Sequence, residues 1–222
     1  QSDMSNQSDL SHRSDFSDWA QLAVFSFEYA LAKLLMEWGV KPAAMIGYSF
    51  GEYAAACISG VFSLPEALKA VVARARLLRR TSAGVMTSVP LTREEIMPGL
   101  TRAGGVSLAI DNGPSCVIAG EPGAVENFEK QMKEKGILCV RVPAERGIHS
   151  HLMEPVLGEF EQELRTATLG KPQIPYVSNV TGDWITEKEA TRPAYWVRHL
   201  RETVQFAGGM NTLLKKPGGI YV

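Results

Sequence analysis

The 222-residue sequence has no excess of basic residues, few cysteines and no long apolar run. Its 23 lysines and arginines against 24 aspartates and glutamates leave a net charge of −1, which gives no electrostatic drive toward nucleic acid or an anionic membrane. The three cysteines are an odd number at unrelated spacings, so they indicate no disulfide framework and fit a reducing cytoplasm. No uncharged apolar run is long enough to span a bilayer, and no charged-then-apolar leader is visible. We therefore expect a cytoplasmic protein without a signal peptide, and with neither nucleic acid nor a membrane as partner.

The stretch from residue 43 to residue 60 carries the most informative pattern. A short apolar run is followed by GYSFG at residues 47–51 and then by a helix-forming run. This order predicts the strand, sharp turn and helix of a nucleophile elbow, with Ser49 as the nucleophile and a glycine on each side to leave it space. The following helix would aim the Phe50 N–H at an oxyanion. The alternative is a serine in an ordinary turn between a strand and a helix.

Two segments precede the elbow. Residues 1–18 contain a hexad repeat, QSDMSN, QSDLSH, RSDFSD, whose apolar members recur every six residues and so form no single helix face. We interpret this segment as a polar linker or surface insertion. Residues 19–38 are apolar nearly all round, which predicts a helix buried between layers.

The residues after the elbow predict two subdomains. Residues 85–142 read as strand, helix, strand, strand, helix, strand, which predicts a small ferredoxin-like βαββαβ subdomain over 85–146. Residues 19–84 and 147–222 flank it and carry the elbow. We therefore expect an α/β fold in which the small subdomain is inserted into a larger, α/β-hydrolase-like one.

Arg74 stands out on the helix that follows the elbow. A capping box at residues 63–66 opens this helix, and Arg74 falls within its apolar arc. A buried guanidinium needs a carboxylate, because an unpaired buried charge costs several kcal/mol. The partner is either an internal Asp or Glu or an anionic substrate, and the helix pattern leaves both open.

Two of the four histidines lie in the sequence ERGIHSHLMEP at residues 145–155. A His-x-His pair on a strand can begin a metal site, but no third ligand cluster follows, so we expect no metal. A general base for Ser49 is the favoured role for this pair. The histidine at residue 199 lies in a helical run between aromatic and charged residues, and we expect it to be structural.

Longer runs extend these patterns into a family resemblance. QLAVFSFEYALAKLLMEWGVKPAAMIGYSFGEYAAACISGVFSL, DNGPSCVIAG, HSHLMEP, SNVTGDWIT and PAYWVRHLRETVQFAGGM resemble the acyltransferase domain of modular type I polyketide synthases. They are more distantly similar to malonyl-CoA:ACP transacylases of fatty acid synthesis. The resemblance covers about residues 19–222.

The resemblance implies a role for each matching residue. Ser49 would take an acyl group from acyl-CoA and pass it to the phosphopantetheine thiol of an acyl carrier protein, with no bound cofactor. His149 would be the general base and then the acid, held by the main-chain carbonyl of Gln205. Arg74 would hold the free carboxylate of a malonyl-type unit, and Asn112 would line the same pocket. Neighbouring synthase domains are the implied partners.

Departures from the family pattern refine these expectations. The family begins with a strand carrying a Gly-Gln-Gly motif and continues past the last residues here, so both ends look truncated and we expect slow transfer. The sequence RGIH at residues 146–149 stands where malonyl-selective members resemble HAFH and methylmalonyl-selective members YASH. Ile148 is therefore expected to favour malonyl, and Tyr48 replaces the usual histidine before the nucleophile.

A second function remains open at this point. In a serine hydrolase, either an esterase or an acyl-clearing relative of the same family, water would take the acyl group from Ser49. Arg74 discriminates between the two, because a hydrolase of neutral esters has no use for a buried guanidinium.

Overall fold

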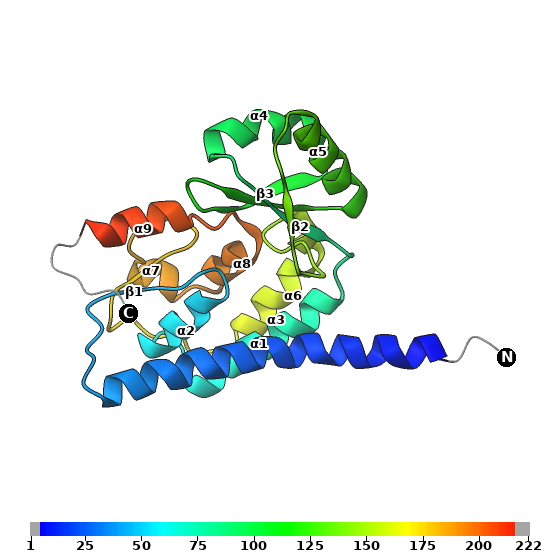
Figure 1. Cartoon of the computed structure of the whole chain (residues 1–222). Coiled ribbons are helices and arrows are strands. Elements are labelled where there is room, and N and C mark those ends of the chain that lie inside the picture. The colour runs from blue at the N-terminus through cyan, green and yellow to red at the C-terminus, as the bar shows by residue number, and fades with distance from the viewer. Residues whose placement is uncertain (1–4, 216–222) are drawn as a thin grey trace.

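The computed structural model describes residues 5–215, which form two parts around two separate sheets (Figure 1). The larger part holds the parallel pair β1-β6 and most of the helices, and the smaller part holds the four-stranded sheet β3-β4-β2-β5. This arrangement confirms the α/β fold class that the sequence predicts.

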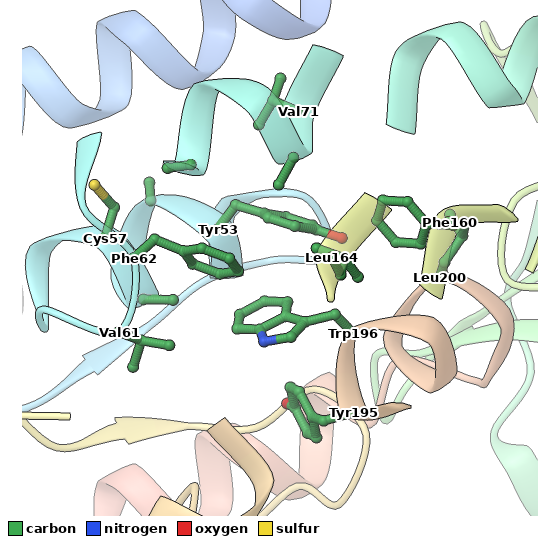
Figure 2. Packing of buried hydrophobic residues seen from close by; sticks show 14 of the residues in the cluster. Tyr53, Cys57, Val61, Phe62, Val71, Phe160, Leu164, Tyr195, Trp196 and Leu200 are labelled. Atoms are coloured by element: carbon green, nitrogen blue, oxygen red, sulfur yellow. The ribbon is translucent and has the colours of Figure 1, made fainter. Parts of the chain in front are cut away.

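The larger part is built around the elbow. Its parallel strands pair Met45 with Tyr176, which brings two distant segments together behind the nucleophile. Buried aromatic rings fill its centre, with Trp196 packed 4.9 Å from Tyr53 and 4.8 Å from Phe62 between ring centroids (Figure 2). Its elements are α1 (Ser5–Glu37), β1 (Met45–Ile46), α2 (Gly51–Ile58), α3 (Leu64–Arg79), a 3-10 turn (His151–Met153), α6 (Glu154–Leu164), β6 (Tyr176–Val177), α7 (Glu187–Ala190), α8 (Pro193–Arg201) and α9 (Phe206–Leu214).

The smaller part has the predicted βαββαβ order. Its neighbouring strands are all antiparallel, and α4 and α5 cover the face that points away from the larger part (Figure 1). The strand order places the first and third strands in the centre, as in a ferredoxin-like fold. Its elements are β2 (Val85–Val89), α4 (Arg93–Ala103), β3 (Val106–Asp111), β4 (Cys116–Gly120), α5 (Pro122–Glu134) and β5 (Val140–Val142).

Residues 5–18, which belong to the segment predicted as a polar linker or surface insertion, are helical. Residues 5–18 continue α1 as one helix with residues 19–37, while residues 1–4 lie outside the described residues. Residues 5–18 contain neither Pro nor Gly, so nothing in them stops a helix that the packed segment has already nucleated. Hexad spacing removes an apolar face, but it does not remove the ability to be helical.

The helix predicted at residues 19–38 is present up to Glu37, but the prediction that it is buried between layers is wrong. Phe25 is 0% exposed, whereas Phe27 is 68% and Trp38 is 73% exposed. The helix α1 packs on α2 and α3 (Figure 1), while its large apolar side chains Val24, Phe27, Leu31 and Leu34 remain exposed. Among the described residues, no helix combines the length and apolar character needed to cross a membrane.

Candidate active site

Ser49 occupies a strained turn between β1 and α2. Its φ of +49° lies in the left-handed region, which an L-residue adopts only where its surroundings enforce it. A Cβ on Gly47 would lie 2.2 Å from the Glu52 nitrogen, so only glycine fits there. A Cβ on Gly51 would meet the Glu28 carboxylate oxygens at 3.5 and 3.9 Å, which is ordinary contact. The predicted need for glycine therefore holds on one side of the serine and not on the other.

Ser49 and His149 form a buried pair. The Ser49 Oγ lies 2.6 Å from the His149 Nε2, and the His149 Nδ1 lies 3.1 Å from the main-chain oxygen of Glu202. A carbonyl oxygen can only accept, so Nδ1 carries the ring proton and donates it to Glu202. Nε2 is then free to accept the Ser49 hydroxyl proton, which is the arrangement a nucleophile and its base require.

The carbonyl that orients His149 belongs to Glu202 and not to Gln205, so that prediction is wrong. Glu202 is the first residue after α8 and has extended backbone (φ −84°, ψ 162°). The Gln205 carbonyl instead accepts from the Gly209 N–H at the start of α9, at 2.9 Å. The resemblance identified the right segment, but the place where α8 ends decides which carbonyl faces the imidazole.

His149 is neutral near pH 7. Burial lowers the pKa of His149 well below its usual value of 6.5, and the neighbouring His199 and Arg74 lower it further. Hydrogen bonds to the carbonyls of Glu202 and His199 act in the opposite direction. The imidazole can therefore accept a proton from Ser49 over the physiological pH range.

The first histidine of the His-x-His pair is the one at the nucleophile, as predicted. His151 begins the 3-10 turn, and its Nδ1 lies 3.4 Å from the Ser107 Oγ of β3. His149 has a φ of +58°, which turns the chain between the two rings so that they do not share a strand face.

Arg74 is buried without a carboxylate. Its side chain is 2% exposed, its Nη1 donates to the Gln21 Oε1, and its guanidinium carbon lies 5.1 Å from the centre of the Phe50 ring. Its Nε and Nη2 have no hydrogen-bond partner, and no carboxylate among the described residues forms an ion pair with it. The alternative of an internal ion pair is therefore wrong, and two N–H groups of one guanidinium edge remain unpartnered.

Phe50 lies at the N-terminus of α2. Its backbone is helical (φ −54°, ψ −34°), and its N–H donates to no residue in the described part of the chain. The first N–H groups of a helix have no intrahelical acceptor and carry the positive end of the helix dipole. The Phe50 N–H is thus free to receive an oxyanion formed on a group bound to Ser49.

Three further residues from the sequence prediction have contacts with residues other than Ser49 and His149. Tyr48 is half-exposed, and its ring contacts that of Phe206 at 4.8 Å between centroids. Ile148 is half-buried and packs against the core of the larger part and against the apolar cluster beneath the four-stranded sheet. Asn112 lies in the turn between β3 and β4, where its N–H donates to the Ser115 carbonyl at 3.0 Å.

Sequence reasoning gave no active-site role to four buried or half-buried polar residues close to the pair. Glu52, Asn179 and His199 are buried behind the elbow, and Gln21 of α1 contacts Arg74. Gln21 and Glu52 interrupt apolar runs, which is the same signal that identified Arg74. Asn179 lies in a loop after β6, and no periodic pattern marks it.

Comparisons with known proteins agree with this geometry. The sequence profile described as "Acyl transferase domain" matches residues 6–219. The spectinabilin polyketide synthase system protein NorB of Streptomyces orinoci is 40% identical over 199 residues, covering 88% of this chain and 9% of that protein. This chain therefore spans a small part of that relative.

Two solved structures have the same fold. The acyl transferase domain of ZmaA is 46% identical, with a TM-score of 0.85 over 90% of this chain and 46% of that one. The acyl transferase domain of SpnD, solved in complex with 2-(pent-4-yn-1-yl)malonyl, is 44% identical, with a TM-score of 0.84 over 87% of this chain and 47% of that one. The chain spans about half the length of these solved relatives. By its profile match and its Ser–His elbow, it belongs to the acyl transferase domain family.

Proposed function

We propose that this chain transfers a malonyl-type acyl group from coenzyme A, through an ester on Ser49, to the phosphopantetheine thiol of an acyl carrier protein in polyketide synthesis. The observation that carries the proposal is the unpartnered edge of Arg74, buried beside an aligned Ser49–His149 pair. Two parallel N–H groups match the two oxygens of a carboxylate. The malonyl derivative bound to the SpnD domain, a relative in the same family, supports this class of acyl group.

The first half of the proposed reaction forms the acyl ester on Ser49. Ser49 Oγ attacks the thioester carbonyl while His149 Nε2 takes the hydroxyl proton. The carbonyl oxygen becomes an oxyanion that accepts from the Phe50 N–H. The carbon–sulfur bond then breaks, and the coenzyme A thiolate leaves with the proton that His149 returns.

The second half reverses these steps with a different thiol. The phosphopantetheine thiol gives its proton to His149 and attacks the acyl ester on Ser49. The ester bond breaks, and the Ser49 oxygen recovers the proton from His149. One base serves both halves, because its pKa is low enough to keep it neutral between turnovers.

Selectivity has two sources in this proposal. Arg74 prefers acyl groups that end in a carboxylate over acetyl or propionyl, because its unpartnered N–H groups are paired only when such a group binds. Ile148, whose branched side chain lies directly before His149, crowds an α-methyl group and favours malonyl over methylmalonyl. A single methyl group is worth only about 1–3 kcal/mol of discrimination.

Intact-protein mass spectrometry after mixing with malonyl-CoA or acetyl-CoA tests the proposal. We expect a malonyl adduct on the parent protein and none on Ser49→Ala. Arg74→Met should reduce malonyl loading by about 30-fold or more, since truncating one partner of a buried charge pair costs about 2–5 kcal/mol. Acetyl loading should stay level or improve in the same variant.

Three results would contradict the proposal. An adduct that persists on Ser49→Ala would remove Ser49 as the nucleophile. Equal losses of malonyl and acetyl loading in Arg74→Met would remove the carboxylate site. Release of free malonate in place of transfer to a carrier thiol would identify the chain as a hydrolase.

A further inference from the structure

The Asn179 side chain holds both sides of the strained serine. Its Oδ1 accepts from the Ser49 N–H at 2.6 Å, and its Nδ2 donates to the Gly47 carbonyl at 2.8 Å. Asn179 is 2% exposed, so these bonds form away from solvent. One side-chain amide thus hydrogen-bonds two main-chain groups of the elbow, the Ser49 N–H and the Gly47 carbonyl.

The backbone of Asn179 extends this contact to the base. Its N–H donates to the Glu52 Oε2 at 2.8 Å, and its carbonyl accepts from the Gln205 N–H at 2.7 Å. Gln205 belongs to the short segment whose Glu202 carbonyl orients His149. Asn179 therefore connects the nucleophile, the elbow helix and the segment that holds the base.

Glu52, which accepts from the Asn179 N–H, is itself held by further contacts. Its carboxylate is fully buried on α2, its Oε1 accepts from the Tyr195 hydroxyl, and its Oε2 lies 3.4 Å from the His199 Nε2. The Tyr195 oxygen also lies 2.7 Å from the Ser178 Oγ. Because Glu52 lies on α2 and its partners Tyr195 and His199 lie on α8, the carboxylate that accepts from the Asn179 N–H is itself held in place.

We infer that Asn179 is a positioning residue for the Ser49–His149 pair. It keeps Ser49 in its positive-φ conformation and keeps the base segment in register with it. A left-handed conformation is unfavourable for a non-glycine residue, and the two side-chain hydrogen bonds of Asn179 offset that cost. The inference rests on the proposed function only in taking Ser49 as a nucleophile, since Asn179 touches no acyl group.

The test combines two measurements on the full chain. Hydrogen exchange of the Ser49 amide reports the bond to Oδ1 directly. Labelling by a fluorophosphonate reports Ser49 reactivity, because Ser49 Oγ forms the bond to phosphorus, fluoride leaves and His149 takes the proton. The variants are Asn179→Ala, which removes both side-chain bonds, and Asn179→Asp, which keeps the acceptor for the Ser49 N–H and loses the donor to Gly47.

Ser178→Ala is the matched control. Ser178 is buried in the same loop, where its Oγ bonds the Val180 N–H and contacts Tyr195, but its side chain bonds neither Gly47 nor Ser49. Loss of Ser178 Oγ therefore weakens the loop without releasing the elbow.

We expect Asn179→Ala to expose the Ser49 amide to exchange and to slow labelling about 100-fold, the effect of misplacing a reacting group by about 1 Å. Asn179→Asp should keep the Ser49 amide protected and slow labelling less. Ser178→Ala should label at nearly the parent rate. If Asn179→Ala does not fold, Asn179→Asp still decides, because an unchanged labelling rate would then overturn the inference.

Two other results would overturn it as well. One is a Ser49 amide that exchanges equally slowly in Asn179→Ala and in the parent. The other is a loss of labelling in Ser178→Ala as large as that in Asn179→Ala. A parent that labels but takes no malonyl would contradict the proposed function alone, and a parent that does not label leaves the exchange measurement to decide the position of Ser49.

Discussion

Asn179 and Arg74 are two polar side chains buried to the same degree around one serine, yet only one of them is fully partnered. Asn179 is 2% exposed and uses both polar side-chain atoms within the protein. Arg74 is also 2% exposed and leaves two of its nitrogens without a partner. Buried polar groups are normally hydrogen-bonded within the protein. We call the Asn179 side of Ser49, where this holds, the completed side, and the Arg74 side, where it does not, the open side. Under the proposed function, the acyl carboxylate pairs with Arg74 on this open side.

The largest expected effect on stability comes from Gly47, a backbone position on the completed side. Gly47→Ala would place a Cβ 2.2 Å from the Glu52 nitrogen, which forces α2 away from the elbow. We expect this variant to lose about 3 kcal/mol or more of unfolding free energy, at the upper end of overpacking effects. Gly51→Ala is the matched control, because its Cβ makes only an ordinary contact and a helical Ala gains about 0.5–1 kcal/mol over Gly.

Urea unfolding of both glycine variants checks this expectation. Similar losses of unfolding free energy in Gly47→Ala and Gly51→Ala would show that the elbow does not exclude a Cβ at Gly47. The contrast between the completed and the open side of Ser49 would then not hold.

The stability of Arg74→Met sharpens the comparison directly. Asn179→Ala should lower the free energy of unfolding by about 1–3 kcal/mol, because it leaves the buried Ser49 N–H without an acceptor. Arg74→Met should leave it unchanged or raise it by about 1 kcal/mol, because it replaces an unpaired buried charge with an apolar chain. A loss above about 1 kcal/mol in Arg74→Met would mean that the ligand-free protein already pairs its guanidinium.

The sequence predicted the features that are local. The pattern at residues 47–51 identified the elbow and Ser49, and the predicted capping box at Ser63 is present at the start of α3. Arg74 was identified by a mismatch between a charged residue and an apolar helix face. Each of these depends on residues within a few turns of one another, where spacing alone fixes the geometry.

The sequence failed where the answer depends on a distant backbone group or on a missing neighbour. The carbonyl facing His149 depends on the end of α8, and Asn179 gains its role from residues about 130 positions away. The apolar pattern of α1 shows which residues can be buried, but not whether anything packs on both sides, so Phe27 and Trp38 were misplaced. These are tertiary facts that no local period encodes.

The smallest expected effect concerns His149, which lies between the completed and the open sides. Burial, then the neighbouring His199, lowers its pKa below 6.5, so the protein loses activity on the acid side only when pH falls well below that value. The sign for stability is the same: a histidine whose pKa is lower in the folded state stabilises the fold above pH 6.5, and this contribution is lost as pH falls through the folded-state pKa.

His199→Phe keeps the ring packing but removes the second cause of the lowered His149 pKa, so the acid limb of fluorophosphonate labelling should move to higher pH. Because burial is the larger cause, the limb should still lie below 6.5. If the acid limb of labelling lies at pH 6.5 in the parent, or does not move in His199→Phe, then the buried surroundings and His199 do not lower the pKa of His149.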